Sequence, residues 1–207
     1  MSEKHYFQED ILAMEKRYRT HFINSLSGYK SANLIGTIDH KSNTNLNIVS
    51  SVVHLGANPA LIGFVNRPHS VERNTLDNIY NNGCYTINHV AIDSFEDAHH
   101  TSARYPSNIS EFDMTAFTEQ YSSIKAPYVK QSSIKIGLEF KQKIDIELNG
   151  TVFIIGEIIE VILDEEIVGY DGKLNLVSAQ STCVSGLDEY HQTTSLGRLA
   201  YAKPKIP

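Results

Sequence analysis

The sequence predicts a mainly β fold, a closed or partly closed antiparallel barrel with a few helices. The clearest observation is a strand over residues 134–148, where isoleucine, leucine and phenylalanine alternate with lysine, glutamate and aspartate. Asn149-Gly150 follows, a pair that favours the two positive-φ positions of a type I′ turn, and residues 151–163 return as a second strand. Many strands joined by turns, with few helical segments, favour an antiparallel barrel.

The first 25 residues are predicted to form a helical cap. Ile11, Leu12 and Met14 lie on one side of a short helix, and residues 18–26 lead from it into the sheet. Residues 31–39 and the strand that begins at Leu46 are apolar runs separated by the turn-rich segment HKSNTN. We therefore expect these two runs to pair as an antiparallel hairpin.

Residues 45–65 read as an apolar strand with two serines at its centre, an Asn-Pro break, and a second apolar strand that leads to Arg67. A buried hydroxyl without a partner costs about 1–3 kcal/mol. Ser50 and Ser51 therefore either find partners within the sheet or face a polar ligand, and both interpretations stay open.

Arg67, Asn74 and Thr75 follow within eight residues of one another. A surface arginine and an ordinary helix cap would give them a purely structural role. Arginine also binds phosphate through two parallel N–H groups, and the free amides at a helix N-terminus hold anions. Because these residues come directly after a strand that suggests a ligand, they predict a phosphate-binding site.

Residues 91–133 contain Tyr105-Pro106 and Ala126-Pro127 and show no sustained periodicity. They are predicted to leave the barrel as a loop and short-helix excursion of the kind that often shapes sites. Asp171-Gly172-Lys173 is a tight turn, and a less regular tail follows it. We expect a single domain over residues 1–207.

The composition excludes several classes of function. The net charge is -6, without the basic excess that nucleic-acid binding needs. The N-terminus lacks the apolar core of a signal peptide and no later run approaches a membrane span, so a cytoplasmic protein without membrane or nucleic-acid partners is expected. The two cysteines have no CxxC or metal-ligand spacing, so neither a structural disulfide nor a metal site is expected.

The reactive residue types form no known catalytic motif. Nine histidines include His99-His100, but adjacent side chains diverge and no HExxH pattern is present. The GxSxG nucleophile motif and the GxGxxG dinucleotide fingerprint are also missing, so a nicotinamide cofactor would bind only as a transient substrate. His191 either lines the surface that a substrate contacts or is a solvated loop residue.

The order of these features resembles the flavin reductase-like, FMN-binding split-barrel family. The shared pattern is a strand, a proline turn, a second strand, an arginine, a short helix and then GCYTIN at 83–88. Further segments in the family's order are SAR at 102–104, SEFD at 110–113, GTVFIIGE at 150–157, and a tail with Gly186, Tyr190 and RLAY at 198–201. The likeness covers residues 17–203 and rests on this order, since no single motif is diagnostic.

The resemblance implies a six-stranded Greek-key split barrel that binds FMN. It places the residues of one strand beside the flavin ring, namely Asn47, Val49, Ser50, Ser51 and Val52. It places a second group on the phosphate side, namely Arg67, Asn74 and Thr75, with Ser102 and Arg104 from a further loop.

The implied function is an FMN-binding oxidoreductase in which NAD(P)H reduces the flavin and the electrons pass to free flavin or another acceptor. Because the cofactor carries the chemistry, no catalytic residue is predicted. Two alternatives stay open: a flavoredoxin-like electron carrier that binds FMN and serves protein partners, and a barrel that has lost flavin. A homodimer is also implied, and apolar residues on the second face of the hairpin agree with it: Phe153, Ile155, Ile159 and Val161.

Overall fold

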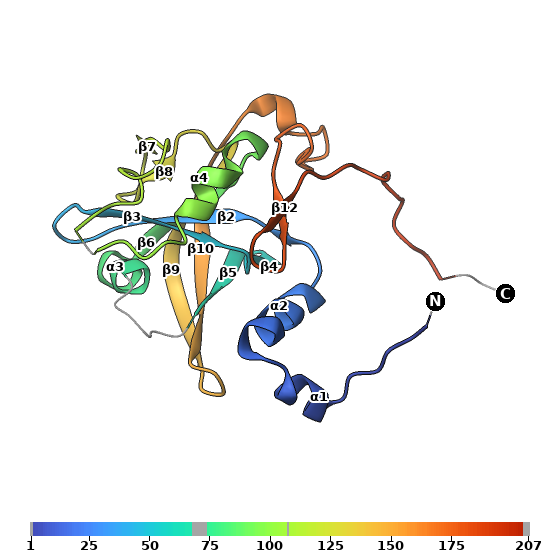
Figure 1. Cartoon of the computed structure of the whole chain (residues 1–207). Coiled ribbons are helices and arrows are strands. Elements are labelled where there is room, and N and C mark those ends of the chain that lie inside the picture. The colour runs from blue at the N-terminus through green and yellow to red at the C-terminus, as the bar shows by residue number, and fades with distance from the viewer. Residues whose placement is uncertain (1, 68–73, 107, 205–207) are drawn as a thin grey trace.

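The computed structural model describes residues 2–67, 74–106 and 108–204. Its main sheet is antiparallel throughout and has the strand order β3-β2-β6-β9-β10-β5-β4 (Figure 1). The strands are β2 (Asn33–Ile38), β3 (Thr44–Val49), β4 (Val53–Ala57), β5 (Ala60–Asn66), β6 (Cys84–His89), β9 (Ile134–Ile146) and β10 (Thr151–Leu163).

The two ends of this sheet, β3 and β4, do not pair with each other, so the barrel is split. The chain bends at residues 50–52 and passes from β3 directly into β4. This bend divides one barrel strand into two segments, which explains seven strands where the resemblance implies six. The predicted mainly β split-barrel fold is confirmed.

Smaller elements surround the barrel. A three-stranded sheet contains β1 (Lys30–Ser31), β11 (Cys183–Ser185) and β12 (Glu189–His191), and β7 (Glu119–Gln120) pairs with β8 (Tyr128–Val129). The helices are α1 (Gln8–Ala13), α2 (Lys16–Leu26), α3 (Asn74–Asn82), α4 (Phe95–His100) and the 3₁₀ turns η1 (Ile92–Ser94) and η2 (Glu165–Ile167). Among the described residues, no helix is long and apolar enough to cross a membrane.

The N-terminal segment contains two helices rather than one. The Glu15 carboxylate accepts hydrogen bonds from the amides of Arg17 and Tyr18, at 2.8 and 3.0 Å, and so caps the start of α2. Residues 18–26 were expected to lead into the sheet. They do so as part of a second helix, because this cap begins a helix that continues to Leu26, shortly before β1 at Lys30.

The predicted hairpin of β9 and β10 is confirmed, but its turn is not a type I′ turn. β9 ends at Ile146 and residues 147–150 form the loop, in which Gly150 has a φ of 70° and Asn149 does not have a positive φ. The Asn149 side-chain oxygen instead accepts hydrogen bonds from the amide and the hydroxyl of Thr151, at 3.1 and 2.7 Å.

A β-bulge changes the direction of the side chains midway along this hairpin. Ile155 pairs with Gln142 and Gly156 pairs with Phe140, which leaves Lys141 as the extra residue. The apolar residues of β9 before the bulge, Ile134, Ile136 and Leu138, belong to the interior cluster. Ile144 after the bulge pairs with Phe153 on the outer side and is exposed. The alternation predicted one face of this strand to be exposed to solvent. The bulge changes which residues lie on that face, so the prediction does not apply along the whole strand.

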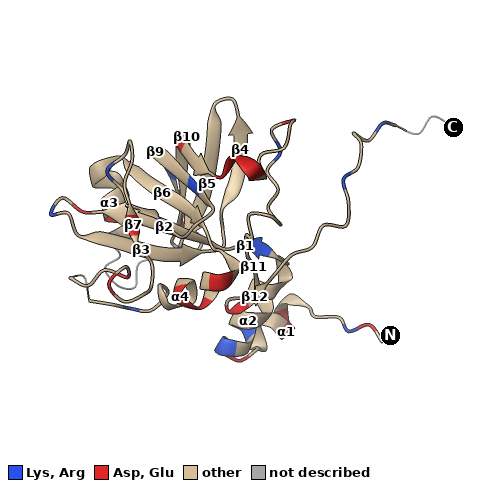
Figure 2. Ribbon diagram, turned by 90° about the horizontal axis from the view of Figure 1, so that it is seen from above, with Lys and Arg blue, Asp and Glu red and all other residues tan. Residues whose placement is uncertain are grey.

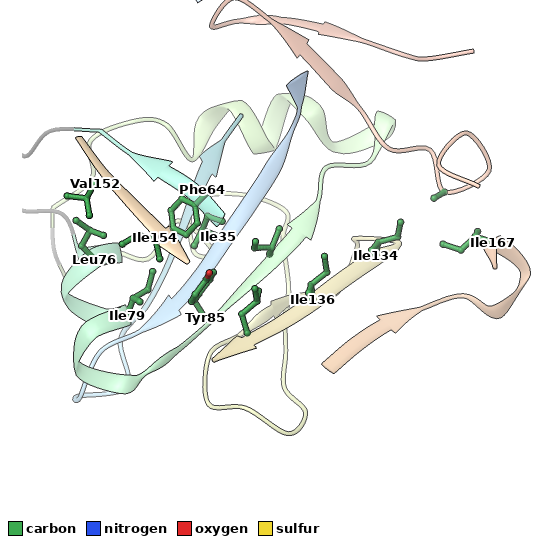
Figure 3. Packing of buried hydrophobic residues seen from close by; sticks show 13 residues of the cluster. Ile35, Phe64, Leu76, Ile79, Tyr85, Ile134, Ile136, Val152, Ile154 and Ile167 are labelled. Atoms are coloured by element: carbon green, nitrogen blue, oxygen red, sulfur yellow. The ribbon is translucent and has the colours of Figure 1, made fainter. Parts of the chain in front are cut away.

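The interior of the barrel is one apolar cluster (Figure 3). Alternate residues of β2, β5, β6, β9 and β10 supply it, and Leu76 and Ile79 of α3 are also part of it (Figure 3). A second cluster on the outside of the sheet includes Leu34, Leu46, Ala98, Phe112 and Val129. α3 and α4 thus contribute to clusters on opposite sides of the sheet.

The predicted excursion, residues 91–133, leaves the barrel and returns over its outer side with α4, β7 and β8. Its end is held by Glu160 of β10, whose carboxylate accepts hydrogen bonds from Ser122, Ser123 and Tyr128 at 2.6 to 2.8 Å. These hydroxyls lower the pKa of Glu160 to about 2. The same segment also reaches β3, as described below.

Candidate functional site

The candidate ligand-binding groups lie along β3, which is an edge strand of the main sheet. The Leu46 amide points away from β2 and donates a hydrogen bond to the Glu111 carboxylate at 2.8 Å. Main-chain groups of an antiparallel strand alternate in direction, so those of Ile48 point the same way as those of Leu46, and Ser50 follows where the chain bends. Within the described part of the chain, no hydrogen bond is found to the outward main-chain groups of Ile48 or to the main chain of Ser50.

The two serines lie at the bend after β3 and not at a strand centre. The Ser51 hydroxyl donates to the Val65 carbonyl and accepts from the Val65 amide, both at 3.0 Å. Its hydroxyl therefore continues the pairing of β4 with β5. Ser51 has a structural partner, whereas the hydroxyl of the half-buried Ser50 makes no hydrogen bond to the described residues.

The bond between Ser51 and Val65 brings the bend close to the end of β5, where Arg67 is exposed. The predicted neighbours of Arg67 lie on α3. Thr75 in the first turn of this helix is buried, and its hydroxyl accepts a hydrogen bond from the Asn45 side chain at 3.0 Å. This contact ties the start of α3 to β3. Arg73 and the side chain of Asn74 lie outside the described residues.

Ser102 and Arg104 follow α4, which packs on β3 from the outer side. The Ser102 hydroxyl donates to the His99 carbonyl at 2.7 Å and the Arg104 side chain is exposed. Within the described residues, no hydrogen bond joins either side chain to Ser51, Arg67 or Thr75. The residues predicted to bind the phosphate thus form two sets on opposite sides of β3. Arg67 and Thr75 form one set, and Ser102 and Arg104 form the other.

Asn47 and Val49 point their main chains toward β2, where they pair with Ile35 and Asn33. The Val49 and Val52 side chains pack against the interior cluster. The outward main-chain groups beside them belong to Ile48, a residue that the sequence reasoning missed. The alternation of the strand could have identified it only if the free side of β3 had been known.

Two buried titratable groups lie near this strand. Burial raises the pKa of the Glu111 carboxyl, and the hydrogen bond from Leu46 lowers it in part. Burial also lowers the pKa of His89 to about 4. His89 pairs in register with Asn33 of β2, and its Nδ1 lies 2.9 Å from the Ser181 hydroxyl. The neutral imidazole is therefore part of the barrel's structure.

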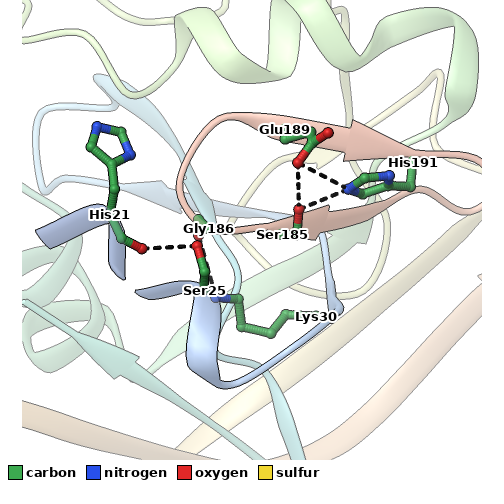
Figure 4. Close-up of polar contacts among 7 residues, drawn as sticks. All are labelled: His21, Ser25, Lys30, Ser185, Gly186, Glu189 and His191. Carbon is green, nitrogen blue, oxygen red and sulfur yellow. Dashed lines mark hydrogen bonds and ion pairs between the residues drawn. The ribbon is translucent and has the colours of Figure 1, made fainter. Parts of the chain in front are cut away.

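His191, for which the sequence left two interpretations, packs within the small sheet (Figure 4). Its Nε2 lies 2.8 Å from the Ser185 hydroxyl, and its ring meets the edge of Tyr29 at 4.8 Å between centroids. Ser185 also donates to Glu189 at 3.0 Å, so the three polar side chains hold the β11–β12 hairpin together (Figure 4). His191 is half-buried, and no hydrogen bond within the described residues joins it to β3.

These features form a candidate binding site and not an acid-base centre. The main chains of Ile48, in the strand, and of Ser50, at the bend, supply donors and acceptors of the kind that a planar, hydrogen-bonding ring needs. Arg67 and the first turn of α3 offer a cation and helix amides to an anion. A split β-barrel with these groups along its open edge fits a ligand that combines a heterocycle with a phosphate.

Comparisons with known proteins identify the family and the fold of the chain. The family described as flavin reductase like domain matches residues 26–177. A solved structure from Shewanella frigidimarina, described as a flavin reductase with a split barrel domain, is 49% identical over 97% of this chain and 100% of that chain, with a TM-score of 0.93. No curated protein matches the chain.

More distant solved structures share the fold. Nitrilotriacetate monooxygenase component B from Bacillus cereus is 16% identical over 96% of this chain and 100% of that chain, with a TM-score of 0.84. Flavoredoxin of Desulfovibrio vulgaris is 21% identical over 84% of this chain and 92% of that chain, with a TM-score of 0.73. The chain belongs to the flavin reductase like domain family.

Proposed function

We propose that this chain binds FMN along the open edge of β3 and uses it as an NAD(P)H-dependent oxidoreductase. The observation that carries the proposal is the outward main chain of Ile48 on the edge strand β3, followed by the bend at Ser50, which the hydrogen bonds of Ser51 with Val65 hold near the end of β5 and Arg67. The polar edge of a flavin ring presents one N–H donor between two carbonyl acceptors, which matches the alternating groups of a strand edge. The family and the solved relative support the proposal.

Each part of the site has a distinct task. Ile48 and Ser50 would orient the ring through their main chains, and the Ser50 hydroxyl would add a further hydrogen bond. Arg67 and the amides at the start of α3 would hold the phosphate. Ser51 keeps the bend in position through Val65 and so supports the ring indirectly.

When bound, FMN would supply the redox chemistry by accepting a hydride from NAD(P)H and passing the electrons to free flavin or another acceptor. The side chains named above bind and orient, and none of them is proposed to transfer a proton. A homodimer forms part of the proposal, because the family resemblance implies one.

The test begins with the visible absorption spectrum of the purified protein and the identification of any chromophore released by acid. Recovered or reconstituted FMN, followed by oxidation of NADH or NADPH with a flavin or dye acceptor, is the expected result. A flavin-loaded protein that oxidises neither nucleotide would contradict the reductase function. If the flavin-loaded protein were nevertheless reduced rapidly by an electron-transfer protein in stopped-flow experiments, the carrier function would replace the reductase function. A protein that takes up no FMN would contradict both.

A further inference from the structure

Glu111 is the only acidic side chain that is buried among the described residues, with 9% of its surface exposed. It lies in the excursion of residues 91–133, and its carboxylate accepts a hydrogen bond from the Leu46 amide of β3 at 2.8 Å. Burying a carboxylate costs free energy, and one hydrogen bond from a main-chain amide offsets that cost only in part. The pKa of this carboxyl is raised by burial, which agrees with an incomplete offset. Packing alone therefore does not explain an acid at this position.

The main chain around Glu111 is fixed by its own contacts. The Glu111 carbonyl accepts hydrogen bonds from the Met114 amide at 3.2 Å and from the Thr115 hydroxyl at 2.8 Å, which closes a tight turn. The next residue, Phe112, belongs with Leu46 to the second apolar cluster, on the outside of the sheet. The carboxylate is therefore held at a defined place along β3.

A second contact joins the excursion to the start of the same strand. The Thr44 hydroxyl donates to the Glu119 carboxylate at 2.6 Å and lies 2.8 Å from the Ser110 hydroxyl. Glu119 is in β7, which lies over β3 in the view from above (Figure 2). Together with the carboxylate on the Leu46 amide, these groups occupy the first part of β3.

The free part of the strand edge begins at Ile48. Within the described residues, no hydrogen bond is found to its outward main-chain groups. Ile48 follows Leu46 by two residues, which is about 7 Å along a strand. A flavin ring displaced by this distance toward the start of β3 would meet the Glu111 carboxylate, and the carbonyl oxygens of its polar edge would face another acceptor. Two facing acceptors repel, so Glu111 disfavours the displaced position.

We propose that Glu111 is a positioning residue for the flavin: it occupies the outward amide of Leu46, ends the free edge of β3 there, and so fixes the ring at Ile48 and the bend at Ser50. The inference rests on the proposed function, because it concerns the same ring on the same strand. Glu111 acts through β3 and takes no part in the redox chemistry. A strand that is already held in its binding conformation binds more tightly, because less ordering accompanies binding.

Two variants of the full chain separate the hydrogen bond of Glu111 from its bulk. Glu111→Gln keeps a side-chain oxygen that can accept from the Leu46 amide, whereas Glu111→Met keeps the length of the side chain without that oxygen. Thr44→Val is the matched control, because it removes the other hydrogen bonds between the excursion and β3 and leaves the Leu46 amide with its partner. Far-UV circular dichroism checks that all three variants fold.

Amide hydrogen exchange, measured by NMR, tests the contact first on protein without flavin. The Leu46 amide should exchange about 10-fold faster in Glu111→Met than in the wild type, Glu111→Gln or Thr44→Val. Equal exchange in all four proteins would overturn the proposal. In the wild type, added FMN should slow exchange of the Ile48 amide more than that of Leu46, and the reverse order would also overturn it. The wild-type measurement stands even if Glu111→Met does not fold.

Flavin binding tests the consequence for the ring. Glu111→Met should weaken FMN and riboflavin binding equally, by about 10-fold in fluorescence titrations, because the position of the ring changes and the phosphate contacts do not. It should also change the visible circular dichroism of the bound flavin, which reports the surroundings of the ring. Glu111→Gln should restore both properties, and Thr44→Val should leave both unchanged. A purely structural role would make Glu111→Met less stable without altering either property.

Failure of this inference and failure of the proposed function give different results. A wild-type protein that binds neither FMN nor riboflavin would contradict the proposed function and this inference with it. A wild-type protein that binds both flavins, together with a folded Glu111→Met variant of unchanged affinity and unchanged visible circular dichroism, would overturn this inference alone.

Discussion

The hydroxyl of Tyr85 lies directly against the α-carbon of Gly156 inside the barrel. A Cβ on Gly156 would be 2.4 Å from that oxygen. The hydroxyl is buried and, within the described residues, has no hydrogen-bond partner, and burial raises its pKa. Gly156→Ala should therefore lower the free energy of unfolding by about 1–3 kcal/mol, measured by urea denaturation, because the rigid ring cannot move aside.

The Tyr85→Phe background tests the cause of that loss. Removing the unpartnered hydroxyl should itself be neutral or stabilise by up to about 1 kcal/mol. In this background Gly156→Ala should cost less, since the closest contact is gone. An equal cost in both backgrounds would show that the hydroxyl is not responsible.

The adjacent serines at the bend should respond differently to substitution. Ser51→Ala removes both hydrogen bonds to Val65 and should lower the stability of the flavin-free protein by about 1–2 kcal/mol. Ser50→Ala should leave that stability nearly unchanged and weaken FMN binding. Thermal or urea unfolding and flavin fluorescence titration measure the two effects. Equal losses of stability would contradict the assignment.

Arg67 is proposed to bind the FMN phosphate, so its contribution should depend on that group. Arg67→Ala should weaken FMN binding by about 10-fold to 100-fold and leave riboflavin affinity unchanged, because riboflavin lacks the phosphate. Arg17→Ala, an exposed arginine on α2, is the control and should change neither affinity. A parallel loss of FMN and riboflavin affinity would remove the phosphate role.

The buried His89 should make stability depend on mildly acidic pH. Its folded pKa of about 4 lies below its ordinary value of 6.5, so the unfolded chain binds more protons between these values. Stability from this group is complete above pH 6.5 and is lost as pH falls toward 4, by about 2 kcal/mol at pH 5. His89→Gln can keep a bond to Ser181 and should flatten this part of the profile. An unchanged slope in the variant would assign it to another group.

Sequence reasoning was most successful where a local pattern determines the structure. The alternation over residues 134–148 predicted β9, and the turn residues around Asn43 predicted the β2–β3 hairpin. The details of the β9–β10 turn and the Lys141 bulge depend on pairing with the partner strand, which the periodicity of one strand does not report. The separate helix α2 was missed although Glu15 offers a cap, because none of its residues is buried within the chain.

The binding role of the predicted site residues stays a prediction, but the structure shows how these residues lie relative to one another. Ser50, Ser51 and Arg67 do lie at one end of the barrel. Which main-chain groups of β3 are free follows from which side of β3 pairs with β2, and this assigns the outward groups to Ile48, next to the bend at Ser50. The use of the Ser51 hydroxyl by Val65 could not have been foreseen, because it depends on a contact across the bend.

The extra residue at Lys141 has a consequence for how this hairpin can change in evolution. Before the bulge, the apolar side chains of β9 fill the barrel, and after it they face outward. One continuous strand therefore contributes to both the interior and the outer surface of the barrel. Deleting a single residue there would exchange the inward and outward sets beyond that point. The length of the hairpin is therefore constrained as strictly as its composition, and homologues should tolerate substitutions in it more readily than insertions or deletions.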